Sequence, residues 1–600
     1  MENATLPNRV PPQTAAATVE AITSLELEIN SLKTHLNTFA AINTRLPTEI
    51  LSDVFLRVLY FEVQCWRGTT DDLMQFHTYH WMKCCSVCRH WRQVALQCST
   101  LWSYIFVNSR YDSTSMLRTF VARSRQTALH VFVNNSPYGL PDRSAAGLVE
   151  VLSEIHRIQE LCIPTRLGRY QLQQLQSVSK LGPALLLTHL TLNGDSLWDI
   201  HSTHTVLALT RRTEPTFPFA SNLPRLSVLK FWRAPLHEAD AVFASSLTQL
   251  TMDRWRPTDS VSPLLHVLKR LVRLQYLSLT HSFSHDDVAV AKDAETVQVD
   301  LPDLRHLIIF STGQSGYWVQ LLDALAFPQT TQVSFISQSG SDMFMPVVMS
   351  NLKNRLTFFN YNKHDAQSPC PFSSMYLRLG RTAPGRLGLW NEHTKHSALD
   401  HEPTFDQGYS DGVPSLTVTW KNTNILDMWS AVNSRLDGAV RGVRYLFCDQ
   451  YLSHCDLADT LRGMVHLQTL CVHQWPDLPS ALQWPLIRTG DSPTPYFPNL
   501  KVLAIFHCTA YTGEHEAWMW WDALIAPLSA RAKHGSLEKV ILFPGRAPAK
   551  ISAEVLAKFD GVVEVLECRD GAKLIATLKD YLPDIFVRTL CEDEKLSLGL

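Results

Sequence analysis

The sequence predicts a mixed α/β fold in which a helical N-terminal segment precedes a long array of stacked repeats. Three observations lead to this prediction. The chain has 600 residues, whereas a single compact core stops growing at roughly 250–300 residues. Hydrophobic residues make up 45% of the chain and charged residues 18%, a composition that can bury a large core. Leucines spaced as Leu-x-x-Leu recur over most of the chain after residue 108, which indicates a repeated structural unit.

The first regular element is expected over residues 21–42, after a polar, disordered tail over residues 1–20. Apolar residues here alternate at spacings of three and four, at Ile22, Leu25, Ile29, Leu32, Leu36 and Phe39. This spacing puts one apolar stripe along a helix, as in the seam of a coiled coil. Because the stripe spans fewer than three heptads, we expect it to pack against the chain's own domain, with self-association as the alternative.

A helical domain is expected over residues 43–108. Pro47 stands where the first residue of a helix would lie, since its missing N–H costs no hydrogen bond there. Apolar residues follow it at helical spacing, and a second, aromatic-rich helical pattern covers residues 81–102. Helices this short carry more apolar surface than they can bury among themselves. Part of that surface is therefore expected to face a partner.

Residues 109–545 repeat a Leu-x-x-Leu strand, a turn and a helical stretch of variable length. Several copies open with a similar phrase, as in Leu223-Pro224-Arg225-Leu226 and Leu301-Pro302-Asp303-Leu304. The pattern resembles leucine-rich repeats. Since one unit cannot bury its own apolar face, we expect an irregular leucine-rich-repeat solenoid with a parallel sheet on its concave side. The pattern is weakest over residues 338–417, interpreted as a loop-rich stretch of the array with irregular strands at Met375–Arg378 and Leu387–Trp390. Residues 546–600 are expected to form a C-terminal cap or tail.

The motifs of the helical domain resemble an F-box. They read Leu46-Pro47-x-Glu49-Ile50-Leu51, then Val87-Cys88-Arg89-x-Trp91-Arg92-x-Val94-Ala95 and Leu101-Trp102. Together with the preceding helix and the Leu-rich array, the chain resembles the F-box-like proteins that are abundant in mushroom-forming fungi. The interval between Phe55 and Val87 is longer than in a compact F-box. It is interpreted as a surface loop, because its Gly, Thr and Asp residues favour turns.

The resemblance implies a function without catalysis. F-box helices bind the Skp-type adaptor of a cullin ubiquitin ligase while the repeats hold a target protein, here unknown. Carried over by position, the resemblance implies that Leu46, Pro47, Ile50, Leu51 and Phe55 meet the adaptor, while Val87, Cys88 and Trp91 pack or contact behind them. The sequence leaves open which of these residues are core and which are interface. The alternative is a repeat scaffold whose F-box-like helices only cap the first turn of the solenoid, because exposed apolar ends of repeat arrays must be covered.

Enzymatic and metal-dependent functions have little support in the sequence. The motifs of hydrolase, phosphate-binding and zinc-protease sites are absent. The cluster His77, His80, Cys84, Cys85, Cys88 and His90 contains a Cys-x-x-Cys spacing. Cys85 and Cys88 nevertheless fall on an apolar stripe, where Cys commonly serves as a small hydrophobic residue. We therefore expect no metal and no other cofactor.

Charge and hydropathy limit the remaining partners. The chain has 54 basic and 56 acidic side chains, which argues against nucleic-acid binding despite the basic and aromatic run around Lys230 and Trp232. No apolar run approaches the roughly 18 residues of a membrane-spanning helix. The thirteen cysteines are scattered and no secretory signal opens the sequence, so an intracellular location, cytoplasm or nucleus, is expected. The run Trp518, Trp520 and Trp521 is interpreted as core, with an exposed recognition patch as the alternative.

Overall fold

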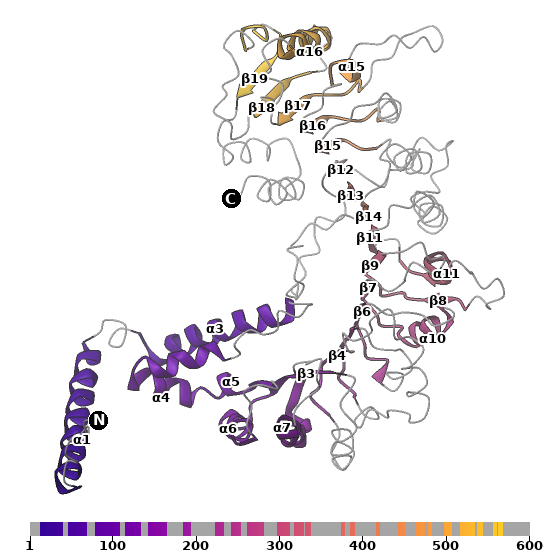
Figure 1. The fold of residues 1–600 in the computed structure, drawn as a ribbon. Helices are drawn as coiled ribbons and strands as arrows, with labels where there is room; N and C mark the ends of the chain where they lie inside the picture. The colour runs from indigo at the N-terminus through magenta and orange to yellow at the C-terminus, as the bar shows by residue number, and fades with distance from the viewer. Residues whose placement is uncertain are drawn as a thin grey trace, which may run out of the picture. The chain divides into compact units, whose positions relative to one another are not determined.

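The computed structural model describes the chain in segments of helix, strand and tight turn. These are residues 12–39, 46–68, 79–107, 114–133, 142–164, 184–193, 223–232, 242–253, 261–280, 297–311, 317–328, 331–337, 374–378, 385–390, 416–420, 442–449, 464–473, 478–482, 497–506, 516–533, 537–543, 556–560 and 562–567. They combine helices with mainly parallel strands, so the mixed α/β class is confirmed (Figure 1). The chain divides into two compact units, Met1–Thr188 and His189–Leu600, which are described separately.

Helix α1 (Pro12–Thr38) opens the first unit. It begins inside the range predicted to be a disordered tail, with a proline at a position that tolerates one. The six apolar residues of the predicted stripe have between 48% and 74% of their surface exposed. The expectation that this stripe packs against the chain's own domain is therefore wrong.

Four short helical elements follow α1, and their apolar sides form an aromatic core. They are α3 (Thr48–Gly68), η1 (His80–Ser86), α4 (Arg89–Gln97) and α5 (Ser99–Trp102). The Trp81 and Trp102 rings pack edge to face at 5.1 Å between centroids, and both also contact Phe120. The Trp102 indole N–H donates to the Ala95 carbonyl at 2.8 Å, so the polar end of this buried ring is satisfied.

The helical elements share their core with the first strands of the chain. Strands β1 (Tyr104–Val107), β2 (Leu129–Val133) and β3 (Ile158–Pro164) are parallel, and helices α6 (Thr114–Ser124) and α7 (Asp142–Ser153) connect them. The Tyr79 hydroxyl donates to the Phe106 carbonyl at 2.7 Å and accepts from the Phe106 N–H at 2.9 Å. In a parallel strand the N–H and C=O groups of one residue face the same neighbour. Both groups of Phe106 bond to Tyr79, so both point away from β2. Tyr79 thus closes the outer edge of β1.

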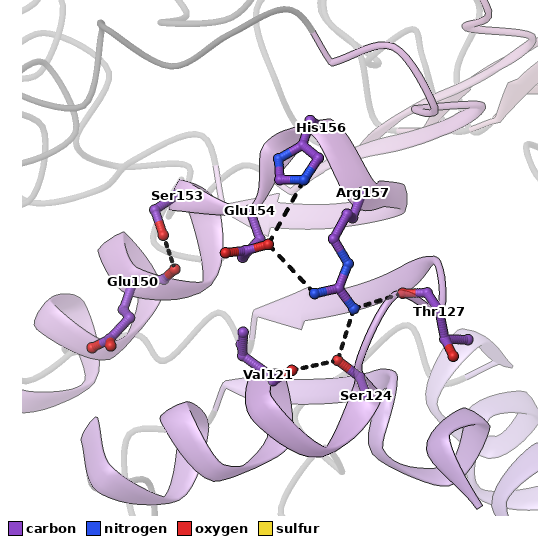
Figure 2. A network of polar contacts seen from close by, with 8 residues as sticks. All are labelled: Val121, Ser124, Thr127, Glu150, Ser153, Glu154, His156 and Arg157. Carbon is purple, nitrogen blue, oxygen red and sulfur yellow. Dashed lines mark hydrogen bonds and ion pairs between the residues drawn. The ribbon is translucent and has the colours of Figure 1, made fainter.

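Arg157 fastens the turn after α6 to the start of β3 (Figure 2). Its Nη2 donates to the Ser124 hydroxyl at 3.0 Å and to the Thr127 carbonyl at 2.9 Å. Its Nη1 lies 3.4 Å from a Glu154 carboxylate oxygen. The guanidinium is buried, so the polar groups around it depend on these bonds rather than on water.

The second unit contains two runs of parallel strands. The first run is β4 (His189–Asn193), β5 (Val228–Trp232), β6 (Gln249–Asp253), β7 (Tyr276–Thr280), β9 (His306–Ser311) and β11 (Gln332–Ser337), each paired with the next. The second run is β15 (Tyr445–Asp449), β16 (Thr469–His473), β17 (Val502–Phe506), β18 (Lys539–Phe543) and β19 (Glu564–Glu567). The register aligns one leucine per strand from β4 to β9, and these side chains are buried: Leu190, Leu229, Leu250, Leu277 and Leu307.

The Leu-x-x-Leu phrase forms the same turn before many of these strands. The N–H of the second leucine bonds to the carbonyl of the first at 3.2 Å in the pairs Leu226 to Leu223 and Leu304 to Leu301. Proline is favoured at the second position of such a turn, which is where Pro224 and Pro302 stand. The repeated phrase therefore sets the entry of the chain into each strand.

Three strands join the two runs. They are β12 (Ser374–Arg378), β13 (Gly385–Trp390) and β14 (Leu416–Trp420), and β13 is antiparallel to both of its neighbours. Strand β14 pairs with β11 and strand β12 pairs with β15, so the sheet continues through this part. The irregular strands expected at Met375–Arg378 and Leu387–Trp390 are thus present as β12 and β13, whereas β14 was not predicted. The weak leucine signal reflects antiparallel pairing instead of the repeat.

Helices accompany both runs. Those of the second unit are α10 (Ser262–Arg270), α11 (Tyr317–Ala324), α15 (Leu478–Leu482) and α16 (Glu516–Lys533), and the short strands β8 (Val299–Asp300) and β10 (Leu325–Ala326) pair with each other. On α16, Trp521 is buried and Trp520 is partly buried, as expected for core residues, while the side chain of Trp518 lies outside the described residues. No helix in the described ranges is long and apolar enough to cross a membrane.

Arg531 holds α16 in place from inside the protein. Its guanidinium is fully buried and donates to the carbonyls of Phe497, at 3.0 Å, and Leu482, at 3.4 Å. Phe497 has a positive φ of 49°, a strained conformation for a bulky residue. Burial lowers the pKa of Arg531 to about 10, so the group remains charged at neutral pH. It fixes the turn that leads into β17.

We predict that Arg157→Met weakens the β2–β3 region. The change leaves the Thr127 carbonyl and the Ser124 hydroxyl without a donor, which costs about 2–3 kcal/mol. Hydrogen exchange of the β2 and β3 amides measures the loss as faster exchange. The control is Arg118→Met, since the Arg118–Glu150 pair is exposed and exposed pairs contribute about 0–1 kcal/mol. Equal exchange rates in both variants would contradict the role of Arg157.

Candidate protein-binding surface

Helix α3 carries two apolar stripes side by side. One stripe is buried and consists of Leu51, Phe55, Leu59 and Val63. The other is between 38% and 72% exposed and consists of Ile50, Val54, Val58 and Phe61. Residues three and four apart share a helix face, so each set is continuous along the helix. The first stripe packs into the aromatic core, and the second lies open.

The structure divides the predicted adaptor-binding residues into two groups. Leu51 and Phe55 have 1% or less of their surface exposed, and Trp91 packs on Phe55 with the ring centroids 5.3 Å apart. Leu51 and Phe55 therefore belong to the core of the domain rather than to its exposed surface. Ile50 and Val87 are at least half exposed, Pro47 is exposed and Leu46 is partly exposed.

The sequence did not predict three of these exposed residues as contacts: Val54, Val58 and Phe61. The interval after Phe55 was interpreted as a surface loop, whereas α3 continues to Gly68 and η1 covers residues 80–86. That interpretation was wrong for residues 56–68 of α3, whereas η1 falls within the helical pattern predicted from residue 81 onward. The signal was present in the sequence, because Leu59 and Val63 continue the spacing of four that Leu51 and Phe55 begin.

Cys88 has a structural role at the start of α4. Its sulfur accepts a hydrogen bond from the Trp91 N–H at 3.5 Å, which caps the helix. Burial raises the pKa of the neighbouring thiols Cys84 and Cys85. Within the described ranges no three His, Cys, Asp or Glu residues are grouped as metal ligands. His77 lies outside those ranges.

Glu62 ties α3 to the first turn of η1. Its Oε1 accepts from the Trp81 N–H at 2.8 Å and lies 3.9 Å from the His80 imidazole. Its Oε2 is buried and has no hydrogen-bond partner among the described residues. Burial raises the pKa of this carboxyl to about 7, although backbone N–H groups around Trp81 oppose the shift. The domain therefore contains one acidic group that exchanges a proton near neutral pH.

The second unit presents a different kind of surface on its first run of strands. On β6, Gln249, Thr251 and Asp253 are partly exposed while Leu250 and Met252 are buried. The same alternation recurs on β9. On β17, in contrast, every residue is buried. One face of the sheet is thus at least partly open on β5, β6, β7 and β9, whereas β17 is buried on both faces.

A row of side chains crosses the open face. The register places Trp232, Asp253, Thr280 and Phe310 opposite one another on β5, β6, β7 and β9. The Thr280 hydroxyl donates to Asp253 at 2.6 Å, so the centre of the row is a polar pair. Adjacent strands are about 4.8 Å apart, which separates the two aromatic ends by roughly three strand spacings. Aromatic residues such as Trp232 and Phe310 are enriched at protein-binding surfaces.

Comparisons with known proteins identify no relative. No protein-family model matches the chain, and no curated protein matches its sequence. The two surfaces described above are therefore the basis for assigning a function.

We predict that the first unit becomes less stable as the pH rises through the pKa of Glu62. The pKa in the folded state, about 7, lies above the ordinary value of 4.5. The stabilisation from the protonated form is complete below about pH 4.5 and is lost as the pH rises through 7. Glu62→Gln keeps a neutral acceptor for Trp81 and removes this dependence.

The measurement is hydrogen exchange of the α3 and η1 amides between pH 5 and 8, corrected for intrinsic exchange. The control is Glu49→Gln on the same helix, whose carboxylate is exposed. We expect the control to follow the wild-type profile and the Glu62 variant to lose it. If hydrogen exchange in Glu62→Gln kept the wild-type dependence on pH, another group would be responsible for it.

Proposed function

We propose that the chain is a substrate-recognition adaptor of a ubiquitin ligase of the Skp-cullin-F-box type. The observation that carries the proposal is the exposed apolar stripe of α3. Soluble proteins rarely expose a contiguous apolar patch unless it binds a partner. The stripe begins at Ile50, within the F-box-like motif, and continues past it to Phe61. Its partner in this proposal is the Skp-type adaptor, through which the cullin is reached.

The contact set differs from the one that the motif alone implies. Ile50, Val54, Val58 and Phe61 form the centre, with Pro47 at the start of the helix. A stripe with this spacing suits insertion of one helix face into an apolar groove. Phe61 is the most exposed of the four and aromatic residues are frequent binding hot spots, so we assign it the largest share of the affinity.

The role requires no reactive side chain. A receptor of this kind raises the effective concentration of target lysines near a ubiquitin-charged enzyme, which depends on geometry and linkage. We propose an intracellular setting, cytoplasm or nucleus, since the ligase and its adaptor act there.

The target-binding part is proposed to be an irregular leucine-rich-repeat solenoid. Successive strands pair in chain order, the leucines align, and a common turn precedes many strands. Within it, we assign target binding to the open face of β5–β9 and its row from Trp232 to Phe310. Strand β17 of the second run, in contrast, offers no exposed side chain.

The competing proposal, that the helices only cap the array, also has support. Tyr79 closes the edge of β1, and Trp81, Trp102 and Phe120 form one core with the first strand and helix. Capping uses the buried stripe of α3 and leaves the exposed stripe unexplained. The two functions are therefore compatible, and only the adaptor interaction separates the proposals.

We predict that Ile50→Asp with Phe61→Asp abolishes tight binding of the Skp-type adaptor from the same organism. Each anchor contributes about 2 kcal/mol, or roughly 30-fold in affinity. Titration calorimetry with the full chain measures the dissociation constant, and circular dichroism verifies folding. The control is Leu185→Asp, an exposed apolar residue outside the helical domain.

Three outcomes are informative. Loss of binding in the double variant alone establishes the stripe as the interface. Equal binding in wild type and double variant places the interface elsewhere on the domain. Absence of any complex with the wild-type chain contradicts the ligase proposal and favours the capping scaffold.

We predict that Trp232→Ala with Phe310→Ala removes target proteins without affecting the adaptor. Both aromatic side chains stand at the ends of the row on the open face, so their truncation removes apolar contact area from its two anchors. Quantitative mass spectrometry of proteins that co-purify with the full chain measures the loss. Val465→Ala, an exposed residue in the turn before β16, is the control. An identical set of proteins from all three chains would exclude this face.

A further inference from the structure

The apolar seam of α1 has the residue types of a two-stranded coiled coil. Assigning Ile22 to position a of a heptad places Ile29 and Leu36 at a, and Leu25, Leu32 and Phe39 at d. Isoleucine at a combined with leucine at d favours parallel dimers. All six side chains are exposed in the single chain, so the seam is available to a partner.

The charges beside the seam complement those of a second copy. In this register Glu28 occupies a g position and Lys33 the following e position, five residues later. A parallel dimer brings a g residue of one helix against the next e residue of the other. Glu28 of each copy therefore faces Lys33 of the other, and the two-fold symmetry forms the pair twice.

Other occupants of the seam fit less well. A helix that lies on an anionic membrane carries Lys and Arg on its polar face, whereas α1 carries Glu20, Glu26 and Glu28 against Lys33 as its one lysine or arginine. The chain's own domain does not cover the seam, as the exposures show. A second copy of α1 supplies apolar residues at positions a and d and the opposite charge at positions g and e. It therefore satisfies both the apolar and the charged positions.

We propose that α1 pairs in parallel with α1 of a second copy of this chain, so that the protein is a dimer at sufficient concentration. Because the seam spans fewer than three heptads, association is reversible. The inference does not rest on the proposed ligase function. Two copies held together would present two target surfaces, which increases avidity for targets that carry two binding segments.

Sedimentation of the full chain between about 1 and 100 μM tests the dimer, since short coiled coils dissociate in the micromolar range. We expect wild type to pass from monomer to dimer and Leu25→Asp with Leu32→Asp to remain monomeric. The control is Leu27→Asp, at the outward f position, where the leucine is 66% exposed. It should dimerise as wild type does. A monomeric wild type, or a seam variant that still dimerises, would overturn the proposal.

Charge reversal tests the partner and its orientation. Glu28→Lys and Lys33→Glu should each weaken the dimer, because every cross pair then has like charges, whereas the chain with both changes should recover it. Leu25→Cys adds a second readout, since position 25 meets its own copy only in a parallel pair. A disulfide between the two substituted positions, mapped by mass spectrometry, supports the parallel dimer. Failure of the double reversal to recover dimerisation would overturn the pairing.

Discussion

The N-terminal unit is organised around the open edge of its first strand. A parallel sheet that grows strand by strand begins with a strand whose outer N–H and C=O groups have no neighbour, and such an edge invites unwanted pairing. Here the Tyr79 hydroxyl satisfies both groups of Phe106, while its ring packs on Phe106 and Phe120. Tyr79 reaches this position because Glu62 anchors the start of η1 beside α3. The helices before β1 are therefore part of the sheet's first layer, and the position of α3 follows from closing that edge.

This constraint explains why one helix can serve two purposes. Closing the edge needs a single apolar face, and α3 supplies it with Leu51, Phe55, Leu59 and Val63. A helix that only capped the array would carry polar residues on its remaining faces. The exposed stripe that ends at Phe61 departs from that expectation and costs solubility. Its presence next to the buried stripe is most simply explained by a partner. Because α3 also contacts β1 through the Tyr60 and Tyr104 rings, a partner bound there would be held rigidly relative to the first strands.

The sequence predicted which residues share a face but not which face meets the core. The spacing of apolar residues anticipated α3, the leucine-bearing strands and the seam of α1. It could not separate Ile50 from Leu51, since both belong to the same broad apolar sector, and only tertiary packing decides between them. Propensity was also overridden where turn-forming residues near Gly68 suggested a loop, although the helix extends to that residue. Strands were predicted at Met375–Arg378 and Leu387–Trp390, where β12 and β13 lie, but their antiparallel pairing was not predicted. The Arg157 and Arg531 anchors left no periodic signal at all.

The burial pattern of the second unit limits where a target can bind. A parallel sheet covered on both faces is built from continuous apolar strands, whereas a sheet with one open face alternates apolar and polar residues. Strand β17, Val-Leu-Ala-Ile-Phe, follows the first rule, and strand β6, Gln-Leu-Thr-Met-Asp, follows the second. Cys471 on β16 is completely buried, which raises the pKa of its thiol, so that part of the sheet is closed to water as well as to a partner. The proposed recognition surface therefore uses the first run, where side chains of β6 and β9 are partly exposed. There the polar pair of Asp253 and Thr280 lies between two aromatic residues, and a protein segment laid across the strands would meet all four.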